Sequence, residues 1–329
     1  MSGRAVVLRE RPLPGRTVAE CLEVVDCAVP DCPPGGVVIA TELLSCDPYQ
    51  RLRMVDTYDL GAAVPARAVG RVVASRDSRL QVGDRVWGVL SWATHVAADP
   101  ASLHPVDPAD GPASHAITVR GMPGLTAYVG MVELGRPAAG QTVVVSGAAR
   151  AVGSIAGQLA ALAGACVVGI VGSATKARLL VDDLGFHAAV RHDGPVPLDE
   201  ALAAATPGGI DVAFENVGGR VLDASLRRLA SGARVVLCGM VAGYDGTGRD
   251  ARVEQLMRLC GAGATMHGLN APAHAHRLDE IGARLGGLVR DGRLRFHEDV
   301  VDGIDRLPAA YAEMLAGGSV GKRLVRVAG

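Results

Sequence analysis

Residues 142–173 read TVVVSGAARAVGSIAGQLAALAGACVVGIVGS, and this stretch decides the fold. It begins with a β-branched run, Thr142–Ser146, and ends with another, Cys166–Val171. Residues 151–175 carry no charge, but the glycines and the change of periodicity favour a buried helix followed by a buried strand over a membrane span. The helical spacing that precedes the second run is that of Val152, Ile155, Leu159 and Leu162.

Apolar runs of this kind alternate with helical stretches from Gln141 onward. Such alternation predicts βαβ units and a parallel sheet. The six runs are Thr142–Ser146, Cys166–Val171, Ala188–Arg191, Ile210–Glu215, Arg234–Cys238 and Ala264–Leu269. We therefore expect an α/β fold with a doubly wound, parallel, six-stranded Rossmann sheet, which is the strand count of a complete dinucleotide-binding domain.

The flanking segments follow a different pattern. The first hundred residues read as an all-β region of short strands separated by Pro and Gly, namely Val37–Leu44, Ala68–Ser75, Asp84–Leu90 and Thr94–Ala98. After a helix predicted over His276–Arg290, the chain becomes β-like again and ends with Gly321–Val327. We expect the sheet domain, residues 123–289, to be inserted in a β-rich domain formed by residues 1–122 and 290–329.

The composition narrows the class of protein. The 329 residues are 49% hydrophobic and 20% charged, and 33 Lys and Arg against 34 Asp and Glu leave a net charge of −1. These values argue against a disordered chain and against a nucleic-acid binder that relies on a basic field. The seven cysteines form no C-x-x-C pair, and residues 1–15 lack the apolar stretch of a signal peptide, so we expect a cytoplasmic protein with reduced thiols.

The turn after the first strand of the sheet block, Ser146–Gly153, leads directly into a helix. Such turns bind pyrophosphate because small residues let the backbone approach the anion, so we predict cofactor contacts at Arg150, Ala151, Val152 and Gly153. In the register of G-x-G-x-x-G, only the last glycine, Gly153, is present. Arg150 occupies the position of closest approach, where its guanidinium must either pair with the pyrophosphate or fill its space.

The residues after the second strand indicate which nucleotide is preferred. An acidic residue about 20 positions beyond Gly153 would bind the ribose hydroxyls of NAD, whereas a basic cluster accommodates the 2′-phosphate of NADP. Here Ser173 is followed by Lys176 and Arg178, and no acid occurs before Asp182. The charges favour NADP(H), although solvated basic residues on a helix face remain the alternative for Lys176 and Arg178.

Several segments together resemble the medium-chain dehydrogenase/reductase superfamily. The most similar branch is the zinc-independent one of leukotriene/prostaglandin reductases and plant double-bond reductases. The matching segments are Leu44–Met54 (LSCDPYQRLRM), Gly121–Tyr128 (GMPGLTAY), Val167–Ser173 (VVGIVGS), Glu215–Gly219 (ENVGG) and Gly321-Lys322, in family order across nearly the whole chain. The resemblance implies a Rossmann domain inserted in a GroES-like, β-rich catalytic domain.

The resemblance also implies an activity, namely NADPH-dependent reduction of the activated C=C bond of enones and enals. Tyr244 matches a tyrosine proposed as proton donor in plant members, and Tyr49 matches one that lines the cleft. Related enzymes are commonly homodimers that pair along the sixth strand. Cofactor contacts of the family fall at Lys176, His192, Asn216, Cys238, Gly239, Met240, Tyr244, His267, Gly268, Leu269 and Ser319.

The chain departs from this pattern at several positions. His192 replaces a tyrosine, Ser319 replaces an asparagine, and Arg150 stands in the glycine turn. No zinc site is expected, because Pro65–Gly70 stands where the alcohol dehydrogenase branch has Gly-His-Glu. Two alternatives to enone reduction therefore remain at this stage, a scaffold used for non-redox cyclisation or elimination of a small metabolite, and a quinone oxidoreductase.

Overall fold

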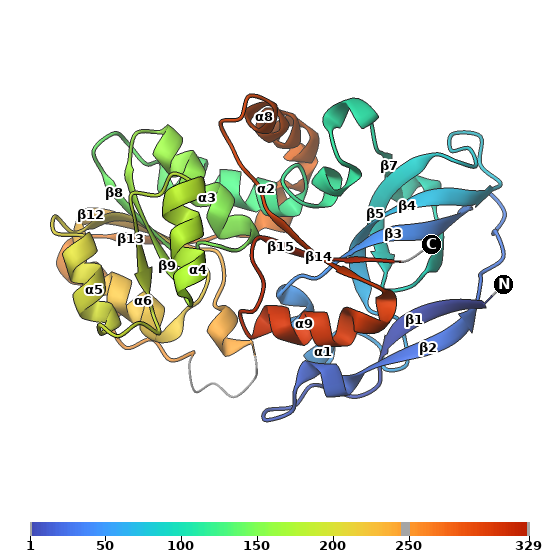
Figure 1. Ribbon diagram of the computed structural model, residues 1–329, viewed down its shortest axis with the longest axis horizontal. Coiled ribbons are helices and arrows are strands. Elements are labelled where there is room, and N and C mark those ends of the chain that lie inside the picture. The colour runs from blue at the N-terminus through green and yellow to red at the C-terminus, as the bar shows by residue number, and fades with distance from the viewer. Residues whose placement is uncertain (1, 245–250, 328–329) are drawn as a thin grey trace. The chain divides into compact units, whose positions relative to one another are not determined.

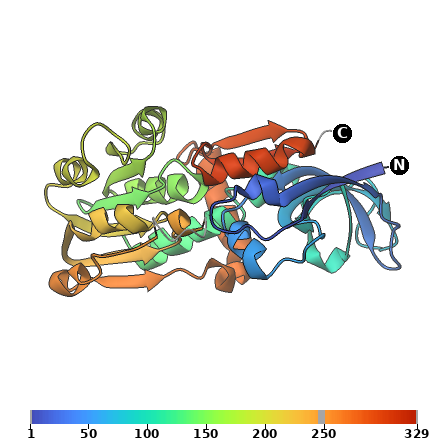
Figure 2. The ribbon, with the colours of Figure 1, turned by 90° about the horizontal axis from the view of Figure 1, so that it is seen from below.

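The computed structural model describes residues 2–244 and 251–327 of the chain. The chain divides into two compact units. Unit 1 comprises residues 1–117 and 298–329, and unit 2 comprises residues 118–297, so unit 2 is inserted in unit 1. The first segment (blue) and the last segment (red) of the ribbon in Figures 1 and 2 accordingly belong to the same unit.

Unit 2 contains, within its described residues, one parallel sheet of six strands (Figure 1). In chain order the strands are β8 (Thr142–Ser146), β9 (Cys166–Val171), β10 (Ala188–Arg191), β11 (Ile210–Glu215), β12 (Leu229–Leu237) and β13 (Thr265–Gly268). Their order across the sheet is β10-β9-β8-β11-β12-β13, and each neighbouring pair is parallel. This is the doubly wound Rossmann order, which reverses between β8 and β11 and places a ligand crevice there.

Helices bury both faces of this sheet. Because successive strand residues point to opposite faces, Val143 and Val145 of β8 pack in one apolar cluster with Ile155, whereas Val144 packs in another with Leu222. The helices of unit 2 are α2 (Met122–Tyr128), α3 (Ala151–Leu162), α4 (Ala174–Arg178), α5 (Leu198–Ala205), α6 (Gly219–Leu226), α7 (Arg258–Ala262) and α8 (Leu278–Arg290). Tyr128, which opens the π-helical continuation of α2, is buried in the first cluster.

Unit 1 is the β-rich, GroES-like unit. Its strands are β1 (Ser2–Leu8), β2 (Leu22–Ala28), β3 (Val37–Ser45), β4 (Pro65–Ser75), β5 (Arg85–Ser91), β6 (His95–Ala98), β7 (Leu103–Pro105), β14 (Glu298–Asp302) and β15 (Lys322–Arg326), and its helices are α1 (Tyr49–Asp56) and α9 (Leu307–Leu315). The larger sheet has the order β14-β15-β3-β4-β5-β7, β6 also pairs with β3, and β1 pairs with β2. The last strand, β15, lies beside β3, so the end of the chain completes this unit.

The prediction of an all-β N-terminal region was wrong at α1. Helix α1 follows β3 and buries Met54 in the core of unit 1, while Arg51 donates from Nη2 to the carbonyl oxygen of Pro12, 2.7 Å away. The antiparallel pair β1–β2 was also missed, because no tight turn joins the two strands. Other elements begin elsewhere than predicted, with the largest differences at β12, which begins at Leu229 and not at Arg234, and at β4, which begins at Pro65 and not at Ala68. Helix α8 begins at Leu278, two residues after the predicted start.

The two transitions between the units lie at residues 117/118 and 297/298, whereas the sequence analysis placed them at 122/123 and 289/290. The turn before α2 belongs to unit 2 because the carbonyl oxygen of Thr118 accepts hydrogen bonds from the N–H groups of Gly121 and Gly124. The segment after α8 belongs to unit 2 because Gln158 of α3 bonds to both backbone groups of Arg295, at 2.8 and 2.9 Å. Leu294 is buried in the same unit.

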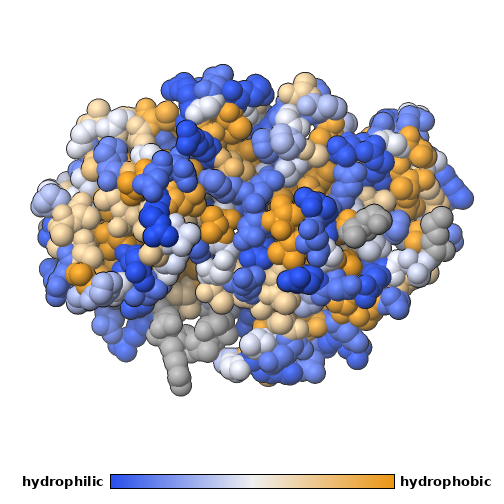
Figure 3. Space-filling model, in the orientation of Figure 1, coloured by the Kyte–Doolittle hydropathy of each residue, from blue (hydrophilic) through white to orange (hydrophobic). Residues whose placement is uncertain are grey.

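None of the helices in the described part of the chain is long and apolar enough to cross a membrane. On the face of the molecule drawn in Figure 3, hydrophilic and hydrophobic residues are interspersed. The exposed large apolar side chains include Leu13, Val82 and Val89, the adjacent Leu256 and Met257, and Tyr49, Leu52 and Val55 of α1. Exposed apolar residues are ordinary on protein surfaces.

Candidate functional site

The predicted cofactor residues of unit 2 gather at the carboxyl ends of the parallel strands, where open α/β sheets bind ligands. They come from separate segments of the chain, but all of them lie at the same end of the strands of one sheet. Arg150–Gly153 follow β8, Ser173–Arg178 follow β9, His192 follows β10, Asn216 follows β11, Cys238–Tyr244 follow β12, and His267–Leu269 end or follow β13.

The turn between β8 and α3 has the geometry of a phosphate-binding turn. Gly147 adopts a φ of 57°, a left-handed conformation that favours glycine. A Cβ at Gly153 would lie 2.5 Å from the carbonyl oxygen of Gly147, so only glycine lets α3 begin this close to the turn. Arg150 is the extended residue before α3, and desolvation lowers the pKa of its half-buried guanidinium.

A buried carboxylate that the sequence analysis did not single out organises the next turn. Glu215 ends β11 and is 1% exposed, and its Oε1 accepts hydrogen bonds from the hydroxyl of Ser146 and from the N–H groups of Val217 and Gly218, at 2.6 to 2.7 Å. Asn216 in turn donates from its backbone N and from Nδ2 to Ser146, at 2.8 and 2.7 Å. The ends of β8 and β11 are thereby joined.

Glu215 also connects β11 to β12, through its backbone. The backbone oxygen of Glu215 accepts from the N–H groups of Cys238 and Gly239, at 2.9 and 3.1 Å. Burial raises the pKa of the Glu215 carboxyl, and its hydrogen bonds from Gly218 and Ser146 offset part of this shift. An acidic residue at the end of the apolar run Ile210–Glu215 is the sequence signal that could have identified this anchor.

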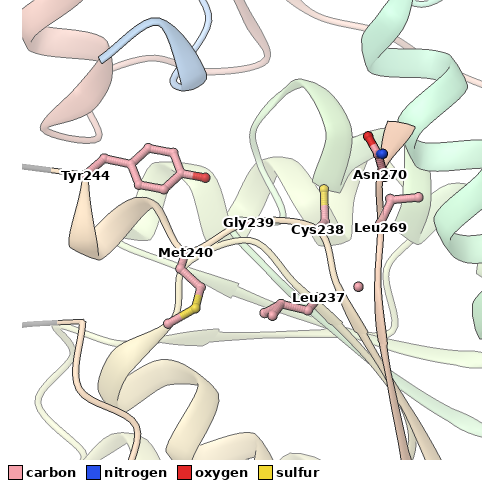
Figure 4. A pocket seen from close by; sticks show the side chains of 8 residues that line it. Leu237, Cys238, Gly239, Met240, Tyr244, Leu269 and Asn270 are labelled. Carbon is pink, nitrogen blue, oxygen red and sulfur yellow. The ribbon is translucent and has the colours of Figure 1, made fainter. Parts of the chain in front are cut away.

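A pocket of about 480 Å³ lies beyond β12 and β13 (Figure 4). The structure brings six of the predicted residues together there and adds Leu237 and Asn270, which the sequence analysis missed. The lining comprises Leu237, Cys238, Gly239, Met240, Tyr244, Gly268, Leu269 and Asn270. His267 is not among the lining residues, and burial raises the pKa of the Cys238 thiol to about 12, which keeps this cysteine a neutral wall of the pocket.

Tyr244 folds back over the turn after β12. A Cβ at Gly239 would lie 3.2 Å from the Tyr244 hydroxyl, so the glycine provides the space that this hydroxyl occupies. Burial raises the pKa of Tyr244, while a hydrogen bond from the Met240 backbone opposes the rise. Because the phenol oxygen accepts from a backbone N–H, its own proton remains for donation to another group.

A basic cluster lies at the ends of β9 and β10. Ser173 caps α4 by accepting from the N–H of Lys176, at 3.3 Å. His192 lies against the end of β9, and Nη2 of Arg220, a residue missed by the sequence analysis, is 3.4 Å from its Nδ1. Arg178 is exposed on α4.

The two remaining predicted residues, Tyr49 and Ser319, belong to unit 1. Tyr49 begins α1 and is 39% exposed, and desolvation together with Asp47 raises the pKa of its phenol to about 12. Arg67 opposes this rise through its charge and a hydrogen bond. Ser319 is buried, in the segment between α9 and β15.

A buried ion pair holds the start of α1. Lys322 is 3% exposed, and its Nζ donates to Oδ1 of Asp47 at 2.7 Å and to the carbonyl oxygen of Cys46 at 2.6 Å. Although burial opposes ionisation of Asp47, the charges of Lys322 and Arg67 keep its pKa below the usual value. The backbone N of Asp47 donates to Oε1 of Gln50. Because the ion pair with Lys322 holds Asp47 in place, it fixes the turn that presents Tyr49.

Among the described residues, no group of three or more His, Cys, Asp or Glu side chains is arranged to hold a metal ion. The arrangement instead suits a dinucleotide. A glycine-dependent turn lies at the point where the strand order reverses, a basic cluster lies at the end of β9, and a largely apolar pocket lies at the ends of β12 and β13.

The chain is similar to known oxidoreductases. Residues 4–106 match the family model of the N-terminal domain of oxidoreductase, and residues 151–274 match that of zinc-binding dehydrogenase. The chain is 36% identical to the NADPH-dependent curcumin reductase of Escherichia coli, over 99% of this chain and 97% of that protein. It is 34% identical to the NADP⁺-dependent 2-alkenal reductase of Nicotiana tabacum, over 88% of this chain and 87% of that protein.

A solved structure has the same fold along the whole chain. The crystal structure of CurA from Vibrio vulnificus in complex with NADPH superposes with a TM-score of 0.92 at 32% sequence identity. The match covers 99% of both chains. Both units of the present structure are therefore shared with an NADPH-binding protein.

Proposed function

The chain belongs to the medium-chain dehydrogenase/reductase superfamily, in the branch of the prostaglandin and plant alkenal reductases, and is an NADP-dependent oxidoreductase; we propose that it reduces the activated C=C bond of α,β-unsaturated ketones and aldehydes. When bound, NADPH would supply a hydride to the β-carbon of the substrate, and the α-carbon would then take a proton. The observation that carries the proposal is the Tyr244 phenol, held over Gly239 in a largely apolar pocket.

The residues of unit 2 would hold NADPH along the edge of the sheet. The N–H groups of the turn before α3 would face the pyrophosphate, beside Arg150 and Gly153. Lys176 and His192 would bind the 2′-phosphate, and Asn216 with the turn after β12 would position the nicotinamide riboside. Leu237, Met240 and Leu269 would exclude water from the reacting end.

Tyr244 is the residue we propose as the proton donor. Hydride addition to the β-carbon develops negative charge on the carbonyl oxygen, and a donor placed there stabilises the transition state. The raised pKa keeps the phenol protonated at neutral pH, and the Met240 N–H stabilises the oxygen as its proton leaves. Tyr49, whose pKa of about 12 likewise keeps it neutral, is proposed as a substrate contact.

The test is the oxidation of NADPH, followed by absorbance at 340 nm, with cyclohexenone, a 2-alkenal and a quinone as separate acceptors. We expect oxidation with the enone and the enal, and Tyr244→Phe to lower kcat by roughly 10² to 10⁴. Tyr128→Phe is the matched control, because Tyr128 is a buried tyrosine of unit 2 whose hydroxyl contacts Arg284. Equal rates for Tyr244→Phe and the control would remove Tyr244 from the reaction.

Arg150 is proposed to pair with the pyrophosphate. It stands directly before α3, in the turn whose N–H groups would face that anion, and a guanidinium there can form charge-assisted hydrogen bonds to phosphate oxygens. Arg150→Ala should therefore weaken NADPH binding by about 1 to 3 kcal/mol, measured by calorimetry. Unchanged or tighter binding would show that the guanidinium does not contact the cofactor.

We also propose a homodimer that pairs along β13. This strand is at the edge of the six-stranded sheet, so its outer hydrogen-bonding groups can extend the sheet into a second copy. Light scattering should give twice the chain mass of 33.7 kDa, and Met266→Pro should give the monomer mass. We further propose that the protein works in a reducing compartment such as the cytoplasm, because its seven cysteines form no C-x-x-C pair.

A further inference from the structure

Three basic residues lie beside the ends of β9 and β10, and we name them the basic recess: Lys176, His192 and Arg220. They come from α4, from the residue after β10 and from the first turn of α6. Nη2 of Arg220 lies 3.4 Å from Nδ1 of His192. A Cβ at Gly172 would lie 2.8 Å from Nε2 of His192, so the imidazole occupies space that a side chain at the end of β9 would fill.

The surroundings of His192 in the basic recess disfavour the charged form of its imidazole. Desolvation lowers the pKa of His192 from its usual 6.5, and Arg220 and Lys176 lower it further. Asp193, the adjacent acid, opposes the shift, but its carboxylate is also paired with Arg191, whose Nε is 3.3 Å away. At pH 7.5 the imidazole is therefore neutral, and Nδ1 can accept a hydrogen bond from Arg220.

We propose that Arg220 is a ligand of the 2′-phosphate of NADPH and that binding of this phosphate favours uptake of a proton from solvent by His192. The inference rests on the NADP dependence of the protein and adds a residue and a protonation step to it. The phosphate is a dianion above its second pKa of about 6, so it attracts the guanidinium of Arg220 away from Nδ1. Nδ1 of His192 can then bind a proton. The negative charge of the phosphate, placed beside the imidazole, stabilises the protonated form.

The sign of the pH dependence follows from this exchange of partners. The pKa of His192 is lowered in the free protein and raised in the complex, so binding takes up a proton whenever the pH lies between the two values. NADPH affinity should therefore rise as the pH falls from 8.5 towards 6.5. NADH lacks the 2′-phosphate, so its affinity should stay flat over the same range.

The decisive experiment is calorimetric titration of the full chain with NADPH and with NADH at pH 7.5, in two phosphate-free buffers that differ in ionisation enthalpy. We expect the NADPH heat to depend on the buffer, corresponding to uptake of a fraction of a proton, and the NADH heat to be independent of it. His192→Tyr replaces the imidazole with a group that stays neutral at this pH, so NADPH should still bind but without buffer dependence. Buffer-independent NADPH heats in the unsubstituted protein would overturn the proton uptake.

Arg220 is tested by Arg220→Gln, which should weaken NADPH binding about tenfold and leave NADH binding unchanged. Arg227→Gln is the control, because Arg227 lies at the other end of α6 and pairs with Asp199. Equal NADPH affinities of the two variants would overturn the role of Arg220. Failure of the unsubstituted chain to bind NADPH at all would overturn the cofactor assignment itself, an outcome distinct from binding without a role for the recess.

Discussion

Asp47 in unit 1 and Glu215 in unit 2 each hold a turn beside the candidate site, and the two carboxylates are stabilised in opposite ways. Asp47 in unit 1 is paired with the buried ammonium of Lys322, and its pKa is lowered. The carboxylate of Glu215 in unit 2 accepts hydrogen bonds from neutral donors, the Ser146 hydroxyl and two backbone N–H groups, and its pKa is raised. Neutral hydrogen bonds therefore do not offset burial of the charge at Glu215, whereas a buried cation does so at Asp47.

The two carboxylates have related structural consequences. Asp47, held by Lys322, donates its backbone N–H to Gln50 in the turn from which α1 begins. The carboxylate of Glu215 accepts from the N–H of Val217, whose carbonyl oxygen accepts from Ala242 in the turn that leads to Tyr244. Each tyrosine that we assign to the reaction thus follows a turn that is held in place by an acidic residue of its own unit. In unit 1, we therefore expect a large loss of stability when Asp47 loses its partner Lys322. In unit 2, we expect that removing the acceptor oxygens of Glu215 costs more stability than removing its charge.

The largest effect is expected for Lys322→Met, which leaves Asp47 buried without its cation. We expect a loss of about 3 to 5 kcal/mol in the free energy of unfolding of unit 1. Trp87 and Trp92, the only tryptophans of the sequence, both lie in unit 1, so urea unfolding followed by tryptophan fluorescence reports on this unit. The double variant with Asp47→Asn should recover much of the loss, and a single variant as stable as the parent would contradict the pairing.

A smaller effect is expected for Glu215→Ala, which leaves the N–H groups of Val217 and Gly218 without their acceptor. The cost should be about 1 to 3 kcal/mol, accompanied by a higher KM for NADPH. Glu215→Gln keeps an acceptor oxygen without the charge, and it should be close to the parent in both measurements. If glutamine proves as harmful as alanine, the charge of Glu215 is needed and the contrast with Asp47 fails.

Ser146→Ala tests the link between β8 and β11, because the Ser146 hydroxyl donates to Glu215 and accepts from the N–H of Asn216. Thermal unfolding should show a loss of about 0.5 to 1.5 kcal/mol. The matched control is Ser225→Ala, since Ser225 is equally buried and its hydroxyl donates to the carbonyl oxygen of Val221 in its own helix. An identical loss of unfolding free energy in both variants would show that the bonds of Ser146 between β8 and β11 add no stability of their own.

The pH dependence of stability should differ in sign between the two acids. The contribution of Asp47 is fully present above its unfolded pKa of about 3.9 and is lost as the pH falls through the lower folded value. That of Glu215 is fully present below its unfolded pKa of about 4.3 and is lost as the pH rises through the higher folded value. Urea titrations of Asp47→Asn and Glu215→Gln against the parent should give stability differences of opposite slope, and parallel slopes would contradict the assignment.

The sheet of unit 2 was largely predictable because its strands are buried on both faces. The predicted bounds of β8, β9, β10 and β11 are those of the structure, since each strand is a near-continuous apolar run. The early start of β12 was not predictable, because the exposed Ser231 and Gly232 interrupt its apolar run.

The candidate site was predictable only where one local segment carries it. The turn after β8 and the turn after β12 are continuous in sequence, and their residues were named. Asp47 and Lys322 are 275 positions apart, and His192 and Arg220 are 28 apart, so no local spacing indicates that either pair meets. Helix α1 was missed for a related reason, because its buried residues pack on segments distant in sequence, such as Pro12.

The central proposal is that this chain transfers hydride to the β-carbon of an enone, and isotope transfer tests it most directly. The enzyme would be mixed with cyclohexenone and NADPH carrying deuterium at the transferable C4 position, and the product analysed by NMR. The account predicts cyclohexanone with deuterium at the β-carbon, formed in proportion to the NADPH oxidised. Deuterium on the carbonyl carbon of an allylic alcohol, or NADPH that binds but is never oxidised by any enone or enal, would contradict it.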